Sequence, residues 1–464
     1  MPPILALSIW IFLLGALLYF DPAKDGKISP ALWLPVVWMF ILGSRLPSQW
    51  FGMEHGFSEE GNPFDRSIDL VLIVLAIAVL ISRSFKWSSF FRRNAALTAY
   101  ISFALLSVLW SDFPFVAFKR WFRDLGDYLM ILVVLSDPRP LNAVCMLLRR
   151  LNYLLIPLSI VLSKYYPTVG KAYNSWNGMG TFVGAATGKN LLGLAAMLSG
   201  IFFFWDTLVR WPDRRKRKTR LIILINLAFL AMTIWLILKA SSTTCYVCLP
   251  LGCMVIAAAQ SKGFRRHLTL LKVLVPGTFC LYLILNFVLG MGGSMAQAVG
   301  KDPTLTDRTK IWAFVLGMHT NPLIGTGYES FWSTARSTYI WKNAGLGPIN
   351  EAHNGYLEVY LNLGMIGLIL LSIFVIASYR RICSRLSPYS NLASLSLAIW
   401  LIMLFWSVTE AGFRSGLMLA VFLLVAVDVP EPARKRVRSM AAIGSMKQFI
   451  QHQSPPLETI GQQR

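Results

Sequence analysis

Residues 351–364 hold side chains that could transfer a proton or bind an anion, and they run directly into a strongly apolar segment. His353 suits a proton acceptor or a hydrogen-bond donor to a phosphate, because the ordinary pKa of histidine is near neutral. Glu351 and Glu358 are the next candidates for the proton acceptor, and Glu410, from a later segment, follows them. A histidine that only caps or bridges the loop is an equally good interpretation of the residue type.

The spacing of the polar residues in this stretch suits a helix with two polar faces. Residues three or four positions apart lie on the same side of a helix. If the helix begins near His353, two sets of residues therefore each share a face. These sets are His353, Tyr356 and Tyr360, and Asn354, Glu358 and Asn362. Ionisable groups at membrane depth are costly unless they face protein or a wet cavity, so we expect both faces to point inward.

Basic residues in the segments between apolar runs form a second group with potential chemistry. Guanidinium groups hold phosphate oxygens with bidentate, charge-assisted hydrogen bonds, so several that converge would bind a multiply charged anion. The candidates are Arg120, Arg123, Lys189, Arg308 and Arg414. For each residue except Arg308, contact with lipid headgroups at the membrane edge is the simpler interpretation. Glu410 and Arg414 are four residues apart, which predicts an ion pair at a helix end.

No metal or cofactor site is expected. The segments that carry these residues contain no Asp-x-Asp pair and no His or Cys cluster with the spacing of metal ligands. The six cysteines lie in apolar runs or beside basic loops, and their spacing completes no zinc site. Positive side chains such as Arg308 would therefore take the place of a metal at an anion.

The elements that position these residues are membrane-spanning helices. The chain is 55% hydrophobic and only 14% charged, far from the balance of a soluble globular protein. Its continuous apolar runs exclude a barrel, whose strands would alternate in hydrophobicity. We therefore predict an all-α polytopic membrane protein with about 12 or 13 transmembrane helices in residues 1–428, followed by a basic, partly disordered cytoplasmic tail at 429–464. The expected spans are residues 3–20, 29–44, 68–82, 96–110, 126–137, 152–163, 190–207, 221–238, 245–260, 271–290, 356–378, 393–408 and 415–428.

The net charge of +22 reflects basic loops and not a nucleic-acid-binding face. Lys and Arg gather in alternate loops, for example in residues 214–218 and 434–436, and such loops face the cytoplasm. The opposite side then receives residues 45–67, 111–125, 164–189, 239–244, 291–355 and 409–414. Among these segments, 291–355 is the longest, carries many aromatic residues and contains a helical pattern at 308–319, so we expect it to pack on the membrane domain.

Several motifs follow one another in residues 300–380 and once more near residue 190. They are Asp-Arg-Thr-Lys-Ile-Trp at 307–312, Asn-Pro-Leu-Ile-Gly-Thr-Gly-Tyr at 321–328, His-Asn-Gly-Tyr at 353–356 running into Leu-Gly-Met-Ile-Gly at 363–367, and Gly-Lys-Asn-Leu-Leu-Gly at 188–193. In order and spacing they resemble the O-antigen ligase and polysaccharide polymerase superfamily, particularly its exopolysaccharide-polymerase branch. The motif at 188–193 departs from that branch, which usually has a histidine at the position of Gly188.

The resemblance implies a GT-C-like membrane glycosyltransferase of the bacterial inner membrane, with its active site facing the periplasm. Its donor would be an oligosaccharide on undecaprenyl diphosphate, and its acceptor a second lipid-linked repeat unit in a polymerase or a lipid A core sugar in a ligase. The resemblance places Arg308 and His353 on either side of the donor diphosphate. Further candidates for binding it are Arg120, Arg123, Lys189, Asn190 and Arg414. Membrane lipid and other polysaccharide assembly or export proteins are the expected partners.

A transporter or flippase of lipid-linked glycans is the main alternative, because buried charge among many spans is typical of transporters too. The sequence has no internal repeat and no pair of broken helices in corresponding halves, and one outer segment dominates. These features favour the enzyme. A scaffold for an export complex would need a sizeable soluble region, and the tail at 429–464 is short.

Overall fold

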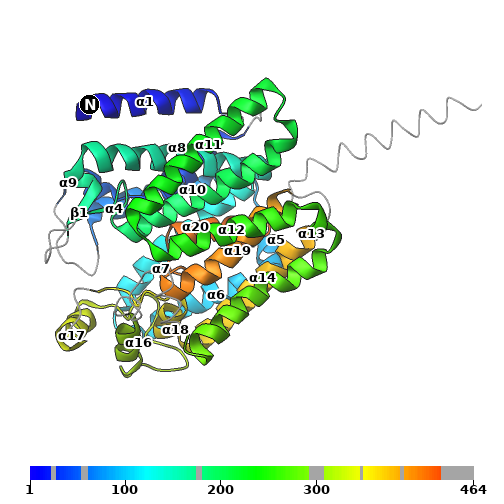
Figure 1. Cartoon of the computed structure of the whole chain (residues 1–464). Coiled ribbons are helices and arrows are strands. Elements are labelled where there is room, and N and C mark those ends of the chain that lie inside the picture. The colour runs from blue at the N-terminus through cyan, green and yellow to red at the C-terminus, as the bar shows by residue number, and fades with distance from the viewer. Residues whose placement is uncertain are drawn as a thin grey trace, which may run out of the picture.

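The structure is a computed structural model that describes residues 1–21, 28–53, 61–173, 180–291, 308–344, 349–386 and 391–429. These residues form a bundle of helices (Figure 1), and their one sheet is a hairpin of two short antiparallel strands, β1 (Lys171–Tyr173) and β2 (Gly180–Phe182). The length and apolar composition of the helices confirm the predicted all-α polytopic membrane fold.

Seven helices among the described residues are long and apolar enough to cross a membrane. They are α8 (Pro140–Tyr165), α10 (Lys189–Arg210), α11 (Arg217–Ala240), α12 (Thr243–Gln260), α14 (Leu268–Leu283, continued by the π-helical turn Ile284–Val288), α18 (Gly355–Arg385) and α19 (Asn391–Thr409). A bent pair, α4 (Pro63–Ser82) and α5 (Trp87–Arg93), can be counted as one further span, with an angle of 104° between its helices. The shorter apolar helices are α1 (Pro3–Tyr19), α2 (Trp33–Gly43, preceded by the 3-10 turn Pro30–Leu32), α6 (Ala95–Leu106, followed by the 3-10 turn Ser107–Trp110) and α20 (Leu417–Ala426).

The helix α7 (Pro114–Leu135) begins earlier than expected. The apolar pattern predicts that this span begins at residue 126, after a loop at 111–125, and this prediction is wrong. Proline suits the first position of a helix, because its missing N–H would have no partner there, and Pro114 occupies that position. Arg120 and Arg123 therefore lie on a helix.

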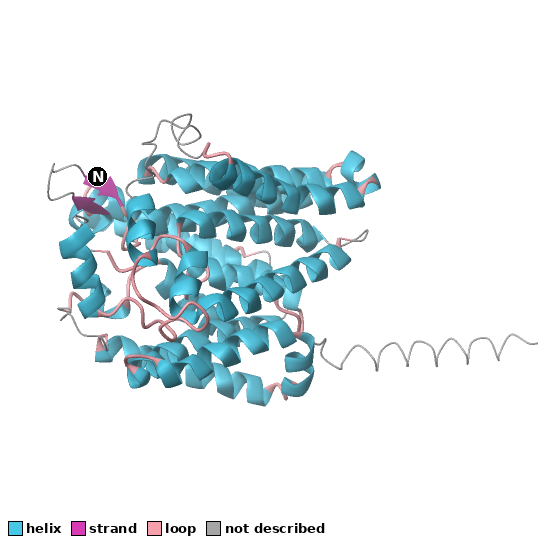
Figure 2. Ribbon diagram, turned by 90° about the horizontal axis from the view of Figure 1, so that it is seen from below, coloured by secondary structure: helices cyan, strands magenta, loops and turns pink. Residues whose placement is uncertain are grey.

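The segments expected on one side of the membrane gather at one end of the bundle. In Figure 1, β1, α9 (Pro167–Gly170), α16 (Arg308–Leu316) and α17 (Thr334–Ala344) lie toward the left, and α5 and α13 (Lys262–Arg266) lie toward the right. Figure 2 shows the strands and a group of loops at the same end. The remaining short helices are α3 (Pro47–Trp50) and the 3-10 turn η4 (Trp211–Asp213). Of the expected outer segment 291–355, residues 292–307 and 345–348 lie outside the described residues, as does the expected tail beyond Val429.

The centre of the bundle consists of helices that are apolar on every side. α10 and α19 are mostly buried and α20 is entirely buried, whereas α14 exposes most of its side chains. A helix that is hydrophobic all round is either enclosed by protein or faces lipid. The enclosed helices position the candidate site, because the start of α10 and the end of α19 bring Asn190 and Glu410 together.

Candidate functional site

α18 is broken at Gly364, and the loop at 321–328, which precedes α17, forms hydrogen bonds to the backbone at this break. Gly364 has a φ of 62° and a ψ of −162°, which are not helical. The backbone hydrogen bonds that cross the break are Thr326 N to Leu361 O, Gly327 N to Asn362 O, Met365 N to Pro322 O and Ile366 N to Leu323 O, with lengths of 3.0, 2.9, 2.9 and 3.1 Å. Residues 321–328 are therefore fixed to the break in α18 by the groups that the helix itself leaves unpaired.

Two glycines allow this close contact. A β-carbon on Gly325 would lie 2.4 Å from the backbone of Asn362, and one on Gly364 would lie 2.3 Å from the backbone of Leu323. Both glycines also have a positive φ, of 66° and 62°, which residues with side chains rarely adopt. The motifs at 321–328 and 363–367, separate in the sequence, therefore form one structural unit.

A small apolar core carries α16 and α17 on the start of α18. Its buried members are Ile311, Val315, Phe331, Trp332, Ile340, Ala352 and Leu361. The predicted helix at 308–319 is confirmed as α16, although it ends at Leu316. Because this core includes a residue of α18, the described part of the outer segment packs on the membrane domain, as expected.

Glu358 fixes the loop that carries His353. Its carboxylate accepts hydrogen bonds from the indole N–H of Trp332, at 2.9 Å to Oε2, and from the backbone N–H of Ala352. A second indole, that of Trp312, donates to the carbonyl of Ala352 at 2.8 Å. Glu358 is 4% exposed and both of its oxygens have partners, so its contacts suit a positioning residue better than a proton acceptor.

Three side chains from separate segments meet at Glu410, which directly follows α19. Arg308, the first residue of α16, donates from Nη2 to Glu410 Oε1 at 2.6 Å. Asn190, at the start of α10, donates to the same oxygen at 3.0 Å. His353 Nδ1 lies 3.4 Å from Glu410 Oε2 and 2.8 Å from Glu351 Oε1. These five residues are named the charged cluster here.

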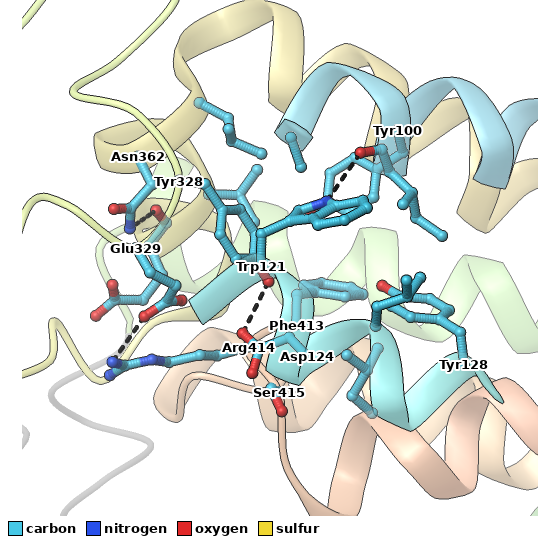
Figure 3. Close-up of a pocket in the computed structure, with 17 residues that line it drawn as sticks. Tyr100, Trp121, Asp124, Tyr128, Tyr328, Glu329, Asn362, Phe413, Arg414 and Ser415 are labelled. Carbon is cyan, nitrogen blue, oxygen red and sulfur yellow. Dashed lines mark hydrogen bonds and ion pairs between the residues drawn. The ribbon is translucent and has the colours of Figure 1, made fainter. Parts of the chain in front are cut away.

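A second ion pair joins Arg414 and Glu329 (Figure 3), and it lies near the charged cluster, because the charge of Arg414 acts on Glu351 as that of Arg308 does. Arg414 Nη2 is 2.7 Å from Glu329 Oε2, and Arg120 donates to the backbone carbonyl of Glu329. The predicted ion pair between Glu410 and Arg414 is wrong. α19 ends before Glu410 and α20 begins after Arg414, so no continuous helix holds the two side chains on one face, and each pairs with another partner.

The other residues predicted to bind an anion differ in their surroundings. Arg123 donates from Nε and Nη2 to Asp124 Oδ1, so a neighbour on α7 already balances its charge. Lys189 is exposed at the start of α10, next to Asn190. Of the predicted residues, the structure groups Arg308, His353, Glu351 and Asn190 at Glu410, and Arg120 and Arg414 at Glu329.

His353 lies outside the helix that was expected to begin there. α18 begins at Gly355, and Asn354 caps it, because its side-chain oxygen accepts from two backbone N–H groups of the first turn. His353 itself has a φ of 48°, in the left-handed region. The predicted faces are therefore wrong for His353 and Asn354, whereas Glu358 and Asn362 are buried as expected.

Two carboxylates keep the imidazole of His353 positively charged. Burial alone would lower its pKa, but the hydrogen bonds to Glu351 and Glu410 outweigh burial and raise the pKa to about 9. Burial would likewise raise the pKa of Glu351, but the bond from His353 and the charge of nearby arginines lower it. At neutral pH, His353 is thus a cation between carboxylates, which suits a hydrogen-bond donor and leaves it no free nitrogen to accept a proton.

Glu351, His353 and Glu410 are also a possible set of metal ligands, since each offers one ligand atom and these atoms lie within 4.8 Å of one another. The sequence predicts no such group, because its third member, Glu410, comes from a distant segment. Two features compete with a cation there. Arg308 already donates to Glu410, and the proton on Nδ1 of His353 would have to leave before a metal ion could bind.

Glu329 belongs to the site but was absent from the residues predicted from the sequence. Its side chain is 12% exposed and paired with Arg414. Its φ of 48° is uncommon for a residue with a side chain, and such backbone strain is concentrated at functional sites. The feature of the sequence that could have identified Glu329 is its position directly after Tyr328, at the end of the motif at 321–328.

Comparison with known proteins relates the central part of the chain to one family. Residues 181–372 match the family model described as O-antigen ligase. The exopolysaccharide production protein ExoQ of Rhizobium meliloti (strain 1021) is 25% identical over 295 residues, which cover 61% of this chain and 63% of that protein. The aligned region is therefore less than two thirds of the length of that relative. Both matches confirm the resemblance inferred from the motifs and support a role as a membrane polysaccharide ligase or polymerase.

Proposed function

Because residues 181–372 match the O-antigen ligase family model, we propose that this chain is a membrane glycosyltransferase of the bacterial inner membrane. It joins oligosaccharide repeat units carried on undecaprenyl diphosphate, at the periplasmic face, during synthesis of a surface or secreted polysaccharide. The name of the ExoQ relative, an exopolysaccharide production protein, supports polymerisation over transfer to a lipid A core. The charged cluster is the observation that carries this proposal.

The charged cluster suits the departure of a diphosphate. Transfer breaks the bond between the anomeric carbon and the diphosphate, so negative charge grows on the leaving group while the sugar gains oxocarbenium character. Arg308 donates from Nη2 to Glu410 and has further N–H groups for phosphate oxygens. His353, as a cation, adds a donor at Nε2. Donors that are already in place stabilise the developing charge without reorganisation at the moment of reaction.

A carboxylate of the charged cluster takes the proton that the acceptor hydroxyl loses. The acceptor oxygen attacks the anomeric carbon and forms the new glycosidic bond, the bond to the diphosphate breaks, and the proton moves to Glu351. Carboxylates perform this proton transfer in many enzymes that act on glycosidic bonds. Glu351 is preferred to Glu358, whose two oxygens already hold Trp332 and Ala352.

The start of α10 and two arginines of α7 add positive electrostatic potential around the diphosphate. Lys189 and Asn190 form the N-terminus of α10, where backbone N–H groups and the helix dipole favour an anion. Arg120 and Arg123 donate to Glu329 and Asp124 and contribute positive potential instead of direct contacts.

Glycan transfer is expected to decline above about pH 9. The pKa of His353 is raised to about 9, so the charged form is complete well below that pH and is lost as the pH rises through it. His353→Gln, which keeps a neutral donor, is expected to be slower at neutral pH by on the order of tenfold and to lose this alkaline decline. The rate of transfer between pH 6 and 10, measured for both proteins, checks the assignment, and an identical alkaline decline in the variant would remove it.

Reconstitution distinguishes the proposed polymerase from its alternatives. The purified full chain is placed in proteoliposomes with lipid-linked repeat units extracted from a strain that lacks the polymerase, with and without lipid A core. Longer lipid-linked glycans are expected. Glycan attached to lipid A core would instead show a ligase, and repeat units that cross the membrane with no new bond would show a transporter.

A further inference from the structure

A pocket lies beside the ion pair of Arg414 and Glu329 (Figure 3), and its empty space, including the part open to solvent, is about 610 Å³. Its walls come from α6, α7, the first turns of α18 and the segment 413–419. Neither Arg308 nor His353 lines this pocket, so it is a space distinct from the charged cluster.

The charged side chains that line the pocket are three carboxylates, Asp124, Glu329 and Glu358, and one guanidinium, Arg414. Asp124 is paired with Arg123 and Glu329 with Arg414, and the carboxylates of the lining outnumber its one guanidinium, so the lining would repel a diphosphate. The pocket instead suits a neutral ligand that donates hydrogen bonds. Hydroxyl groups are such donors, and carboxylates accept from them in strong, charge-assisted bonds.

Aromatic rings supply much of the remaining lining, including those of Trp121, Tyr100, Tyr128 and Tyr328. An aromatic ring offers a flat apolar surface for the C–H face of a sugar, and the hydroxyls at the sugar's edge need polar partners. A polyprenyl chain would bring no hydrogen-bond donor to this lining, so the acceptor positions that Arg123, Tyr328 and Arg414 leave unoccupied would be buried unused. Flat rings combined with carboxylate acceptors therefore fit a sugar better than a lipid chain.

Two residues connect the pocket with the charged cluster. Arg414 lines the pocket, and its Nη1 also lies 3.5 Å from the carbonyl of Asn350, which is adjacent in the chain to that cluster. Glu358 lines the pocket and bonds the N–H of Ala352, the residue before His353. Arg414 and Glu358 therefore connect the pocket with the segment that carries Glu351 and His353.

We propose that this pocket binds a sugar residue of the lipid-linked glycan, with Trp121 against the ring and with Asp124 and Glu329 as acceptors for its hydroxyl groups. The inference rests on the proposed function, in which the charged cluster binds the diphosphate of the same lipid-linked glycan. Tyr328 donates to Asp124 Oδ2 at 2.9 Å and so fixes the orientation of this carboxylate toward the ligand.

Native mass spectrometry of the detergent-solubilised full chain separates sugar binding from diphosphate binding. The protein is titrated with undecaprenyl diphosphate and, separately, with the lipid-linked repeat unit. The wild type is expected to bind the repeat unit about tenfold more tightly than the bare lipid diphosphate, which corresponds to a few contacts with the sugar. Trp121→Ala and Asp124→Asn are expected to bring this ratio close to one without changing the affinity for the bare lipid. Arg308→Ala is expected to weaken both ligands and keep the ratio.

The controls separate a lost contact from a damaged fold. Trp211→Ala removes an exposed indole at the far end of α10 and is expected to keep the wild-type ratio. Tyr328→Phe removes only a hydroxyl, is expected to lower the ratio severalfold, and replaces Trp121→Ala if loss of the indole bond to Ile101 prevents folding. A wild-type ratio of one, or a ratio that the pocket variants leave unchanged, would overturn the sugar site while glycan transfer persists. Absence of transfer by the wild type would instead overturn the proposed function.

Discussion

Replacing Arg308 with alanine is expected to lower glycan transfer by on the order of a hundredfold or more, because one fixed donor to a developing negative charge contributes about this much. The expectation follows from the position of the side chain. Its side chain is 14% exposed and its guanidinium is held by Glu410 at 2.6 Å, so it is already oriented before substrate binds. The alanine variant also leaves Glu410 without its arginine partner, and the negative carboxylate would then repel the diphosphate.

The measurement is the rate of glycan transfer by the reconstituted chain, together with the glycan length in a null strain that carries each variant at equal protein level. Arg308→Lys is expected to retain an intermediate rate, because lysine keeps the charge but loses the planar, bidentate geometry. Arg336→Ala is the matched control, since Arg336 is also an outer-segment arginine in an ion pair, with Asp112, but lies outside the charged cluster. Wild-type glycan length from Arg308→Ala would remove Arg308 from the mechanism.

Gly364→Ala is expected to destabilise the protein by on the order of 3 kcal/mol or more and to abolish transfer. The φ of 62° and ψ of −162° at Gly364 are accessible almost only to glycine. A β-carbon would also lie 2.3 Å from the backbone of Leu323, so the loop at 321–328 would have to leave the break in α18. Because that loop and the start of α18 carry Glu329 and Glu358, both halves of the site would lose their support.

Thermal unfolding of the detergent-solubilised variants, and their transfer rates, test this expectation. Gly277→Ala is the control, because Gly277 lies in α14 with no atom within 4 Å of its would-be β-carbon. Alanine there is expected to be neutral or slightly stabilising, since it favours the helix over glycine. Equal melting temperatures for the two variants would show that the break in α18 does not depend on glycine.

The helices were predictable from the sequence, because a long apolar run in a chain of this composition has few alternatives to a membrane helix. Every expected span overlaps a helix of the structure. The start of α16 at Arg308 was also predictable, from the helical pattern at 308–319. That Arg308 and His353 lie close together was implied only by the family resemblance, because their spacing in the chain carries no geometric information.

The pairing of charges in the site was not predictable. The spacing of Glu410 and Arg414 predicts an ion pair only on a continuous helix, and α19 ends before both residues. Gly364 lies in a stretch that looks like an unbroken apolar helix, and the break becomes understandable only when the loop at 321–328 is seen to bond to it. Both errors have one physical cause, which is that periodicity describes a helix but not the long-range contacts that end or interrupt it.

The buried ion pair of Arg149, which lies away from the site, was not predictable from the sequence for a related reason. Arg149 lies outside the expected span 152–163, yet it is buried between α8, α10 and α11. It pairs with Asp206 at 2.7 Å and donates to Asn226 at 3.2 Å. A charge becomes tolerable in such a position when a partner and hydrogen bonds compensate it, and the sequence does not reveal which distant residues will do so.

The most direct test of whether positive side chains, and not a metal ion, stabilise the departing diphosphate is glycan transfer by the reconstituted chain in excess EDTA. Because Arg308 donates to Glu410 and His353 carries its proton at neutral pH, the wild type is expected to transfer glycan at the same rate with and without the chelator. Loss of transfer in EDTA, with recovery when magnesium is added back, would contradict this role of the charged cluster.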